Sequence, residues 1–210
     1  MRHEAPVGLS GPILCELCSE SNAIYRCLDC VSEGMFCQCC IKATHQRLTE
    51  LLHNVQVMSL PFLSLIYLTN VCQKWTGEFF ARVTLFELGA TYQFGHPAGQ
   101  CCARPSTPVN LTLFDISGVT TVRICYCYCG EPGQQHPPRI QLFRMRLFPA
   151  TLKQPGTAFT FRLLNFFHKL QTRSKVNLYD FYAALVSIGN PAGLNPPIVS
   201  TRPLLVVRTN

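Results

Sequence analysis

The sequence predicts a mixed α+β protein. We expect a small zinc-stabilised module, then a helix, a β-hairpin tied by a further zinc ion, and a C-terminal pair of helices. Three observations predict this order: Cys-x-x-Cys pairs and two histidines within residues 15–53, two β-like runs near residue 117, and helical apolar spacing after residue 157. With 48% hydrophobic and 10% aromatic residues, most of the 210-residue chain is expected to fold.

Residues 15–56 form the predicted zinc module. A structural Zn²⁺ site takes four N or S ligands in a tetrahedron, and a Cys-x-x-Cys turn places two thiolates on one metal. A segment this short buries little apolar surface, so metal binding would supply most of its folding free energy. Three such turns and two histidines supply eight ligands, enough for two closed sites: Cys15, Cys18, Cys27, Cys30, Cys37, Cys40, His45 and His53.

An interleaved pairing would join this segment into one cooperative unit, and it resembles the cross-brace of B-box zinc fingers. The first metal would take Cys15, Cys18, Cys37 and Cys40, and the second Cys27, Cys30, His45 and His53. A sequential pairing is the alternative. Cys39 is expected to be a spare thiol, or else to replace Cys37 or Cys40.

The thirteen cysteines predict a reducing compartment, because residues 1–14, an expected flexible lead-in, lack the apolar run of a signal peptide. We therefore expect a nuclear or cytoplasmic protein that is not secreted, and we disfavour a disulfide framework.

The formal net charge of +7 counts every cysteine as neutral. Three zinc sites with charges of −2, 0 and −1 would leave a net charge of about +4.

Basic charge is concentrated in the second half of the chain. No acidic residue occurs between Glu131 and Asp180, whereas eight Lys and Arg residues lie there. This pattern could face phosphates, and the alternative is an ordinary solvated surface. The candidate nucleic-acid contacts are Arg139, Arg144, Arg146 and Lys153.

Residues 57–73 are an apolar run that is too short and too interrupted to span a bilayer, so no membrane partner is expected and a buried helix or strand is predicted. Residues 74–130 begin with a predicted helix, in which apolar residues from Trp75 to Leu88 recur at helical spacing until Gly89. After a loop over 96–108, runs 109–116 and 119–128 flank a Ser117-Gly118 turn and predict a hairpin.

A third zinc site is predicted at the end of this hairpin. Residues two apart on a strand face the same side, so Cys127 and Cys129 can reach one metal. The hairpin would bring them toward His96 and toward Cys101 or Cys102. The predicted ligands are His96, Cys101, Cys127 and Cys129, with Cys125 as an alternative; buried cysteines without metal are the competing interpretation.

Residues 131–190 are predicted to be a basic helical segment. The apolar stripe that includes Phe159, Leu163 and Phe167 is typical of a helix packed on a core. A second helix is expected to follow, with Asn177 as its N-cap and Asp180 at the position that the helix dipole favours. Residues 191–210 contain four prolines and are expected to be coil.

Several blocks, taken in order, resemble the CxC-like cysteine cluster that precedes the catalytic region of KDZ-type (Kyakuja, Dileera and Zisupton) transposases of fungi. The resemblance covers residues 15–197. It rests on YRCLDC and FCQCC with His45 and His53, then KWTGEFF, LGATYQFGH, the hairpin ending in CYC, QLFRMRLFPAT and SKVNLYDFYAAL. It implies a metal-binding region of a DNA transposase, whose RNase H-like catalytic domain lies downstream of this chain.

The chain departs from the family pattern at two places. In the family, the block that contains His53 is followed at once by KWTGEFF, but here Val57 to Gln73 intervene. Our hypothesis is that these 17 residues are a retained short intron. The tail IVSTRPLLVVRTN also no longer resembles the family.

Two functions are carried forward. The first is a zinc-stabilised module that binds DNA, for example at transposon ends, and the second is a B-box-like module for protein contact or self-association. Two-metal phosphoryl transfer needs several carboxylates at one site. The second half of the chain offers only Asp115, Glu131 and Asp180, which are scattered along the sequence. We therefore expect no catalysis and no small-molecule substrate. A RING-type ubiquitin ligase is a third, weaker alternative, because RING domains normally place a histidine among the cysteines.

Overall fold

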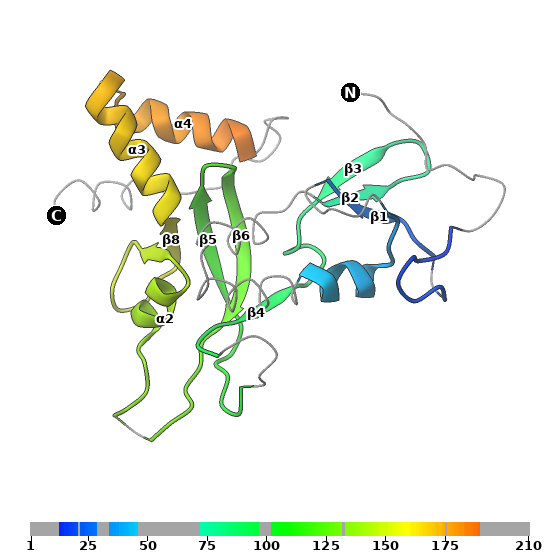
Figure 1. Cartoon of the computed structure of the whole chain (residues 1–210), viewed down its shortest axis with the longest axis horizontal. Helices are drawn as coiled ribbons and strands as arrows, with labels where there is room; N and C mark the ends of the chain where they lie inside the picture. Colours follow the sequence, from blue (N-terminus) through cyan, green and yellow to red (C-terminus); the bar gives the residue numbers. More distant parts are fainter. Residues whose placement is uncertain are drawn as a thin grey trace, which may run out of the picture. The chain divides into compact units, whose positions relative to one another are not determined.

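The structure is a computed structural model, and it describes residues 13–20, 22–28, 34–45, 72–96, 102–131, 133–174 and 176–189 (Figure 1). It divides into two compact units. Unit 1 comprises Met1–Ala90 with Pro97–Gly99, and unit 2 comprises Thr91–His96 with Gln100–Asn210. Helices and strands are mixed, which confirms the α+β class. The boundary falls inside the segment 74–130 that the sequence analysis treats as one piece.

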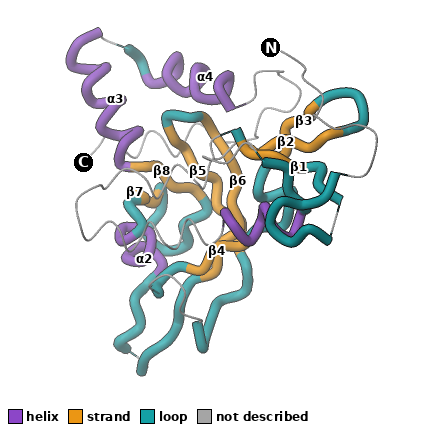
Figure 2. The backbone as a smooth tube through the Cα atoms, turned by 45° about the vertical axis from the view of Figure 1, so that its right-hand side comes forward, coloured by secondary structure: helices purple, strands orange, loops and turns teal. Residues whose placement is uncertain are grey.

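Unit 1 contains a small antiparallel sheet in the order β1-β2-β3. Its strands are β1 (Tyr25–Cys27), β2 (Cys72–Trp75) and β3 (Phe80–Val83). Residues 38–45 are helical, as Figure 2 shows in purple. Cys72 and Gln73, the last two residues of the predicted insert, are part of β2, where Gln73 accepts a hydrogen bond of 2.8 Å from Arg26. The remainder of the insert lies outside the described residues.

The helix predicted from Trp75 to Leu88 is wrong, because this stretch forms β2, β3 and a single helical turn. Gly77 has a φ of +104° in the turn between the strands, a conformation that favours glycine and ends any helix. Trp75 and Phe80 face each other across the hairpin, with ring centroids 4.9 Å apart. The apolar spacing therefore reflects cross-strand packing. The Arg26 guanidinium lies 3.6 Å from the centre of the Phe80 ring and adds a cation–π contact.

Unit 2 is built on a five-stranded sheet in the order β4-β6-β5-β8-β7. β4 (Thr91–Gln93) runs parallel to β6 (Gly118–Cys125), which pairs antiparallel with β5 (Val109–Asp115). β8 (Thr157–Thr160) is parallel to β5 and antiparallel to β7 (Leu147–Pro149). The predicted hairpin is confirmed as β5–β6. Asp115 pairs with Gly118, so the turn is Ile116-Ser117, one residue earlier than expected.

The predicted C-terminal pair of helices is confirmed as α3 (Phe161–Ser174) and α4 (Leu178–Gly189). Asn177 caps α4, because its side-chain oxygen accepts a 2.8 Å hydrogen bond from the Asp180 N–H. The core of this part consists of Phe114, Ala150, Phe159, Leu163, Phe181 and Leu185. No helix among the described residues is long and apolar enough to cross a membrane.

The segment 131–190 is less helical than predicted. It also contains the short helix α2 (Pro138–Arg144) and the strands β7 and β8. These strands are only three and four residues long, so an alternating pattern has little length in which to appear.

A buried carboxylate connects the β5–β6 turn to the start of α3. The side chain of Asp115 is fully buried and forms an ion pair with Arg162. It also accepts hydrogen bonds from the hydroxyls of Ser117 and Thr160, each at 2.7 Å. Thr160 in turn accepts a hydrogen bond from the Leu163 N–H and so caps α3. One side chain thus links the end of the central strand β5, the β5–β6 turn and the start of α3.

We predict that Asp115→Asn lowers the free energy of unfolding by about 2–3 kcal/mol. Removing one partner of a buried pair costs roughly 3–5 kcal/mol, and the cost is smaller here because the Arg162 side chain remains 15% exposed. The measurement is denaturant unfolding of the metal-replete chain at pH 7. Glu131→Gln removes an exposed carboxylate and is the matched control, for which a change within about 0.5 kcal/mol is expected.

The stability gap between the natural chain and Asp115→Asn should depend on pH. Burial alone would raise the pKa of Asp115, but hydrogen bonds from Arg162, Ser117 and Thr160 outweigh it and hold that pKa below its ordinary 3.8. A depressed folded-state pKa gives stabilisation above the unfolded value of about 3.9, which is lost as the pH falls through the lower folded value. A gap that stayed constant from neutral pH through that range would contradict the assigned charge.

Candidate metal centres

Among the described residues, three groups of cysteine and histidine side chains could each hold a metal ion. In each group, the ligand atoms all lie within 4.8 Å of one another. We name them cluster I (Cys15, Cys18, Cys37, Cys40), cluster II (Cys27, His45, Cys72) and cluster III (His96, Cys102, Cys127, Cys129). Clusters I and II lie in unit 1, and cluster III lies in unit 2.

Cluster I joins two Cys-x-x-Cys turns. Cys15 and Cys18 lie in a tight turn, whereas Cys37 directly precedes the helical residues 38–45 and Cys40 lies within them. The Cys40 N–H donates to the Cys37 sulfur at 3.4 Å, which orients the second pair. The sulfur atoms of Cys18 and Cys37 are 4.0 Å apart. The structure thus brings together the four cysteines that the sequence analysis assigns to one metal.

Ionisation is divided unevenly within cluster I. Burial would raise the pKa of Cys15, but hydrogen bonds from the backbone N–H groups of Cys37, Cys18 and Leu17 lower it to about 6. Its neighbours, chiefly Cys37, raise the pKa of Cys40 to about 12. Closely spaced thiolates repel one another, so they do not all ionise at neutral pH without a cation. A divalent cation at the centre of the group removes this conflict.

Cluster II differs from its predicted composition. Cys27 and His45 come together as expected, but the third member is Cys72, which the sequence analysis leaves unused. The other two predicted ligands, Cys30 and His53, lie outside the described residues. All three side chains of the cluster are buried.

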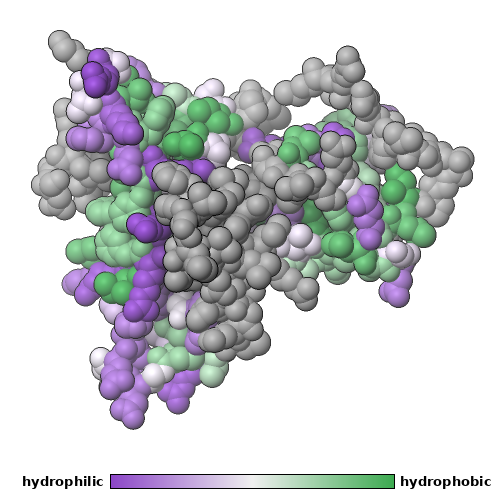
Figure 3. Space-filling view, in the orientation of Figure 1, coloured by the Kyte–Doolittle hydropathy of each residue, from purple (hydrophilic) through white to green (hydrophobic). Residues whose placement is uncertain are grey.

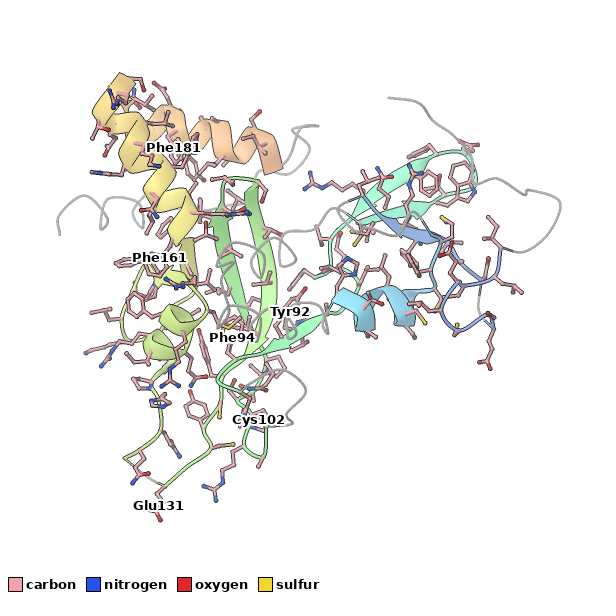
Figure 4. The ribbon with its side chains drawn as sticks, in the orientation of Figure 1. Tyr92, Phe94, Cys102, Glu131, Phe161 and Phe181 are labelled. Carbon is pink, nitrogen blue, oxygen red and sulfur yellow. The ribbon has the colours of Figure 1, made fainter. Side chains whose placement is uncertain are left out.

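Cluster III lies at one end of the sheet of unit 2. His96 follows β4, Cys127 and Cys129 follow β6, and Cys102 lies near the strand ends, as labelled in Figure 4. The sulfur atoms of Cys102 and Cys129 are 3.6 Å apart, and His96 Nε2 is 3.0 Å from the Cys127 sulfur.

Two predicted alternatives for cluster III have different outcomes. Cys102 occupies the position for which either Cys101 or Cys102 was considered, and Cys101 lies outside the described residues. Cys125 is buried at the end of β6 and is not a member of the group.

The thiol pKa values also differ within cluster III, as they do within cluster I. A hydrogen bond with His96 is the main cause that lowers the pKa of Cys129 to about 6, whereas burial and the neighbouring thiols raise the pKa of Cys102 to about 11.

Gln141 supports cluster III from α2. Its buried side chain accepts a 2.8 Å hydrogen bond from the Cys127 N–H and donates one of 2.8 Å to the Cys127 carbonyl. A further bond of 2.7 Å reaches the His136 carbonyl. Gly95 allows this close approach, because a Cβ there would lie 2.6 Å from Cys127 Cβ and 2.7 Å from Gln141 Oε1. The sequence contains no motif that would have identified Gln141.

The sulfur spacings fit a tetrahedral metal site. With metal–sulfur bonds of about 2.3 Å, as in zinc sites, the sulfur atoms lie about 3.8 Å apart at tetrahedral angles. The observed 3.6 Å and 4.0 Å bracket that value and far exceed the roughly 2.05 Å of a disulfide. The donor sets of thiol and imidazole also match the ligands that Zn²⁺ prefers.

The four candidate nucleic-acid contacts are exposed in unit 2. Arg139 and Arg144 lie on α2, Arg146 follows that helix, and Lys153 lies in the loop between β7 and β8. Arg144 donates a 3.0 Å hydrogen bond to His136.

We predict that Gln141→Leu weakens metal binding by cluster III by roughly 10- to 100-fold, the usual effect of losing a residue that orients a ligand. The measurement is a competition titration of the Co²⁺-loaded full chain with a chelator. The absorption of Co²⁺ bound to thiolates is the signal that reports how much metal the chain retains. Gln134→Leu makes the same change at an exposed position and should leave the affinity unchanged. Equal affinities for both variants would show that Gln141 does not position Cys127.

One family model matches the chain, and it covers residues 85–193. Its description is "CxC2 like cysteine cluster associated with KDZ transposases". The match includes cluster III, Gln141 and both C-terminal helices, whereas cluster I and cluster II lie before it. Searches of curated proteins and of solved structures found no match. Because the family model covers more than half of the 210 residues, this chain belongs to the CxC2-like cysteine cluster family associated with KDZ transposases.

Proposed function

We propose that this chain is the zinc-binding, non-catalytic N-terminal region of a KDZ-type transposase, and that unit 2 contacts DNA in the nucleus, for example at transposon ends. The membership in a transposase-associated family supports the context. The observation that carries the DNA-binding part is the unequal distribution of charge between the two units.

Zinc is the proposed metal for clusters I and III, each of which has four described donors. Thiolate with imidazole is a donor set that suits Zn²⁺, and four donors per site would form closed, structural centres. In unit 1 the two clusters alternate along the chain, since Cys27 lies between the two pairs of cluster I and His45 follows them. This order supports a cross-brace like that of B-box fingers, in which each metal stabilises the other.

Among the described residues, all of the excess positive charge lies in unit 2. Among its described residues there are nine Lys and Arg and three Asp and Glu, namely Arg104, Arg123, Arg139, Arg144, Arg146, Lys153, Arg162, Lys169 and Arg173 against Asp115, Glu131 and Asp180. The described part of unit 1 is balanced, with Arg26, Lys42, Lys74 and Arg82 against Glu16, Glu20, Glu78 and Glu87. A polyanion such as DNA is therefore attracted to unit 2.

The proposed contact surface lies around α2 and the β7–β8 loop. Arg139, Arg144, Arg146 and Lys153 are all exposed there, and no acidic residue lies between Glu131 and Asp180. Figure 3 shows hydrophilic side chains in purple over α3 and over the loops below α2. Exposed Arg and Lys side chains provide contacts to phosphates, which position a protein on DNA without reading its sequence.

The carboxylates of unit 2 support a non-catalytic role. Two-metal phosphoryl transfer needs carboxylates that converge on one site. Asp115 is instead buried in its ion pair with Arg162, and the Asp180 carboxylate accepts a 2.6 Å hydrogen bond from the Asn177 side chain in the first turn of α4. Glu131 lies at the tip of an exposed loop (Figure 4).

A role in protein contact is the second candidate, and one observation on unit 1 favours it. Leu14, Leu17 and Leu28 are exposed by 55%, 58% and 57%, although leucine is usually buried. Charge balance in this unit makes DNA a poor partner for it. The two roles are compatible, with unit 1 binding protein and unit 2 binding DNA.

The DNA-binding role predicts strong salt dependence. The full zinc-loaded chain should bind duplex DNA with an affinity that falls steeply between about 50 and 200 mM salt, as counterions are displaced from phosphates. The double variant Arg139→Ala/Lys153→Ala should lower the slope of log K against log salt by about 1 for each phosphate that the variant no longer neutralises. Fluorescence anisotropy with a labelled duplex measures both quantities.

The matched control is Lys42→Ala/Lys74→Ala, which removes the same charge from unit 1 and should leave the slope unchanged. If the natural chain does not bind at about 50 mM salt, or binds without salt dependence, the DNA-binding proposal fails. The protein-contact candidate then remains, and its assay is self-association of the chain in sedimentation.

A further inference from the structure

Cluster II lies in unit 1, outside the residues that the family model matches. Its members differ from the predicted ligand set, because Cys72 was not among the predicted ligands. Cys27 ends β1, Cys72 begins β2, and His45 is the last described residue of the helical stretch 38–45. Their exposed fractions are 4%, 0% and 1%, so all three donors are removed from solvent.

The two cysteines are held together by strand pairing. Cys27 and Cys72 are directly opposite each other in the antiparallel register of β1 and β2, which is continued by the pairs Arg26–Gln73 and Tyr25–Lys74. The hydrogen bond of 2.8 Å between the side chains of Arg26 and Gln73 secures the neighbouring pair. The strand pairing therefore holds the two cysteines opposite each other, with both side chains on the same face of the sheet, before any metal binds.

His45 is oriented as a ligand. Its Nδ1 lies 2.6 Å from the Ile41 carbonyl oxygen, which can only accept, so Nδ1 carries the proton. Nε2 is then the nitrogen with a lone pair, and it lies 4.0 Å from the Cys72 sulfur. Histidines that bind metals commonly donate their other ring N–H to a backbone carbonyl in this way, since the bond fixes both the tautomer and the ring orientation.

We propose that Cys27, His45 and Cys72 bind a divalent metal ion of the zinc class, with Cys72 supplied by β2. This deepens the proposed zinc-binding function and rests on it. The expected separation of a sulfur and a nitrogen on a tetrahedral zinc ion is about 3.6 Å, and the observed 4.0 Å is close to it. The three described donors carry the proposal, which does not depend on Cys30 or His53.

The proposed site makes Cys72 an essential part of unit 1. Cys72 and His45 are 27 residues apart in sequence, so a shared metal would close that length of chain. The segment Val57–Gln73, interpreted above as a retained intron, contains Cys72. Removing the segment would therefore remove a ligand.

The first test uses the full natural chain with ¹¹³Cd in place of zinc. In a ¹¹³Cd–¹H correlation spectrum, one cadmium resonance should couple to the Hβ protons of Cys27 and Cys72 and to the His45 ring. If clusters I and III give cadmium resonances and cluster II gives none, the inference is overturned while the proposed function stands. If no cluster binds cadmium, both fail. A mass spectrum of the purified protein, recorded without reductant, that shows a Cys27–Cys72 disulfide would also overturn the inference.

The second test counts zinc ions per chain by native mass spectrometry. Cys72→Ser should lose one zinc, and Cys39→Ser, which changes an exposed cysteine in the same unit, should lose none. Cys72→His supplies a different donor at the same position and should restore the lost zinc. Retention of every zinc by Cys72→Ser would contradict the proposed role of Cys72.

Discussion

Repulsion between closely spaced thiolates is the constraint on which both units depend. Each cluster gathers its donors from separate segments to within 4.8 Å, which is close enough for one ionised thiol to oppose ionisation of the next. Neighbouring thiols are the main cause of the raised pKa of Cys40 and add to the effect of burial on the pKa of Cys102. Hydrogen bonds lower the pKa values of Cys15 and Cys129 instead. A bound divalent cation would convert the repulsion into attraction, so metal binding and folding are expected to be coupled.

The sequence was most informative where ligands are close together in the chain. A Cys-x-x-Cys turn is local, so the association of Cys15 and Cys18 with Cys37 and Cys40 could be proposed without a structure. Cys72 could not, because it lies 27 residues beyond His45 in an apolar run, and only the pairing of β1 with β2 places it opposite Cys27. Gln141 was missed for a related reason, since its role depends on the distance of α2 from Cys127.

The fold could be predicted in part for similar reasons. The β5–β6 hairpin and the two C-terminal helices have long, regular patterns, and their local signals agree with the structure. The predicted helix after Trp75 failed because aromatic residues that face each other across a turn can imitate helical spacing. Gly77, at a φ of +104°, was the local signal of a turn within that stretch.

The central claim is that the clusters are zinc centres, and the most direct measurement is the zinc content of the full chain purified without added metal. Elemental analysis combined with native mass spectrometry gives the number of ions per chain. We expect close to three zinc ions, one for each cluster, with folding lost when a strong chelator removes them. A chain that is folded with one zinc ion or none would contradict the account. The thiols of at least two clusters would then be packed together without a metal ion.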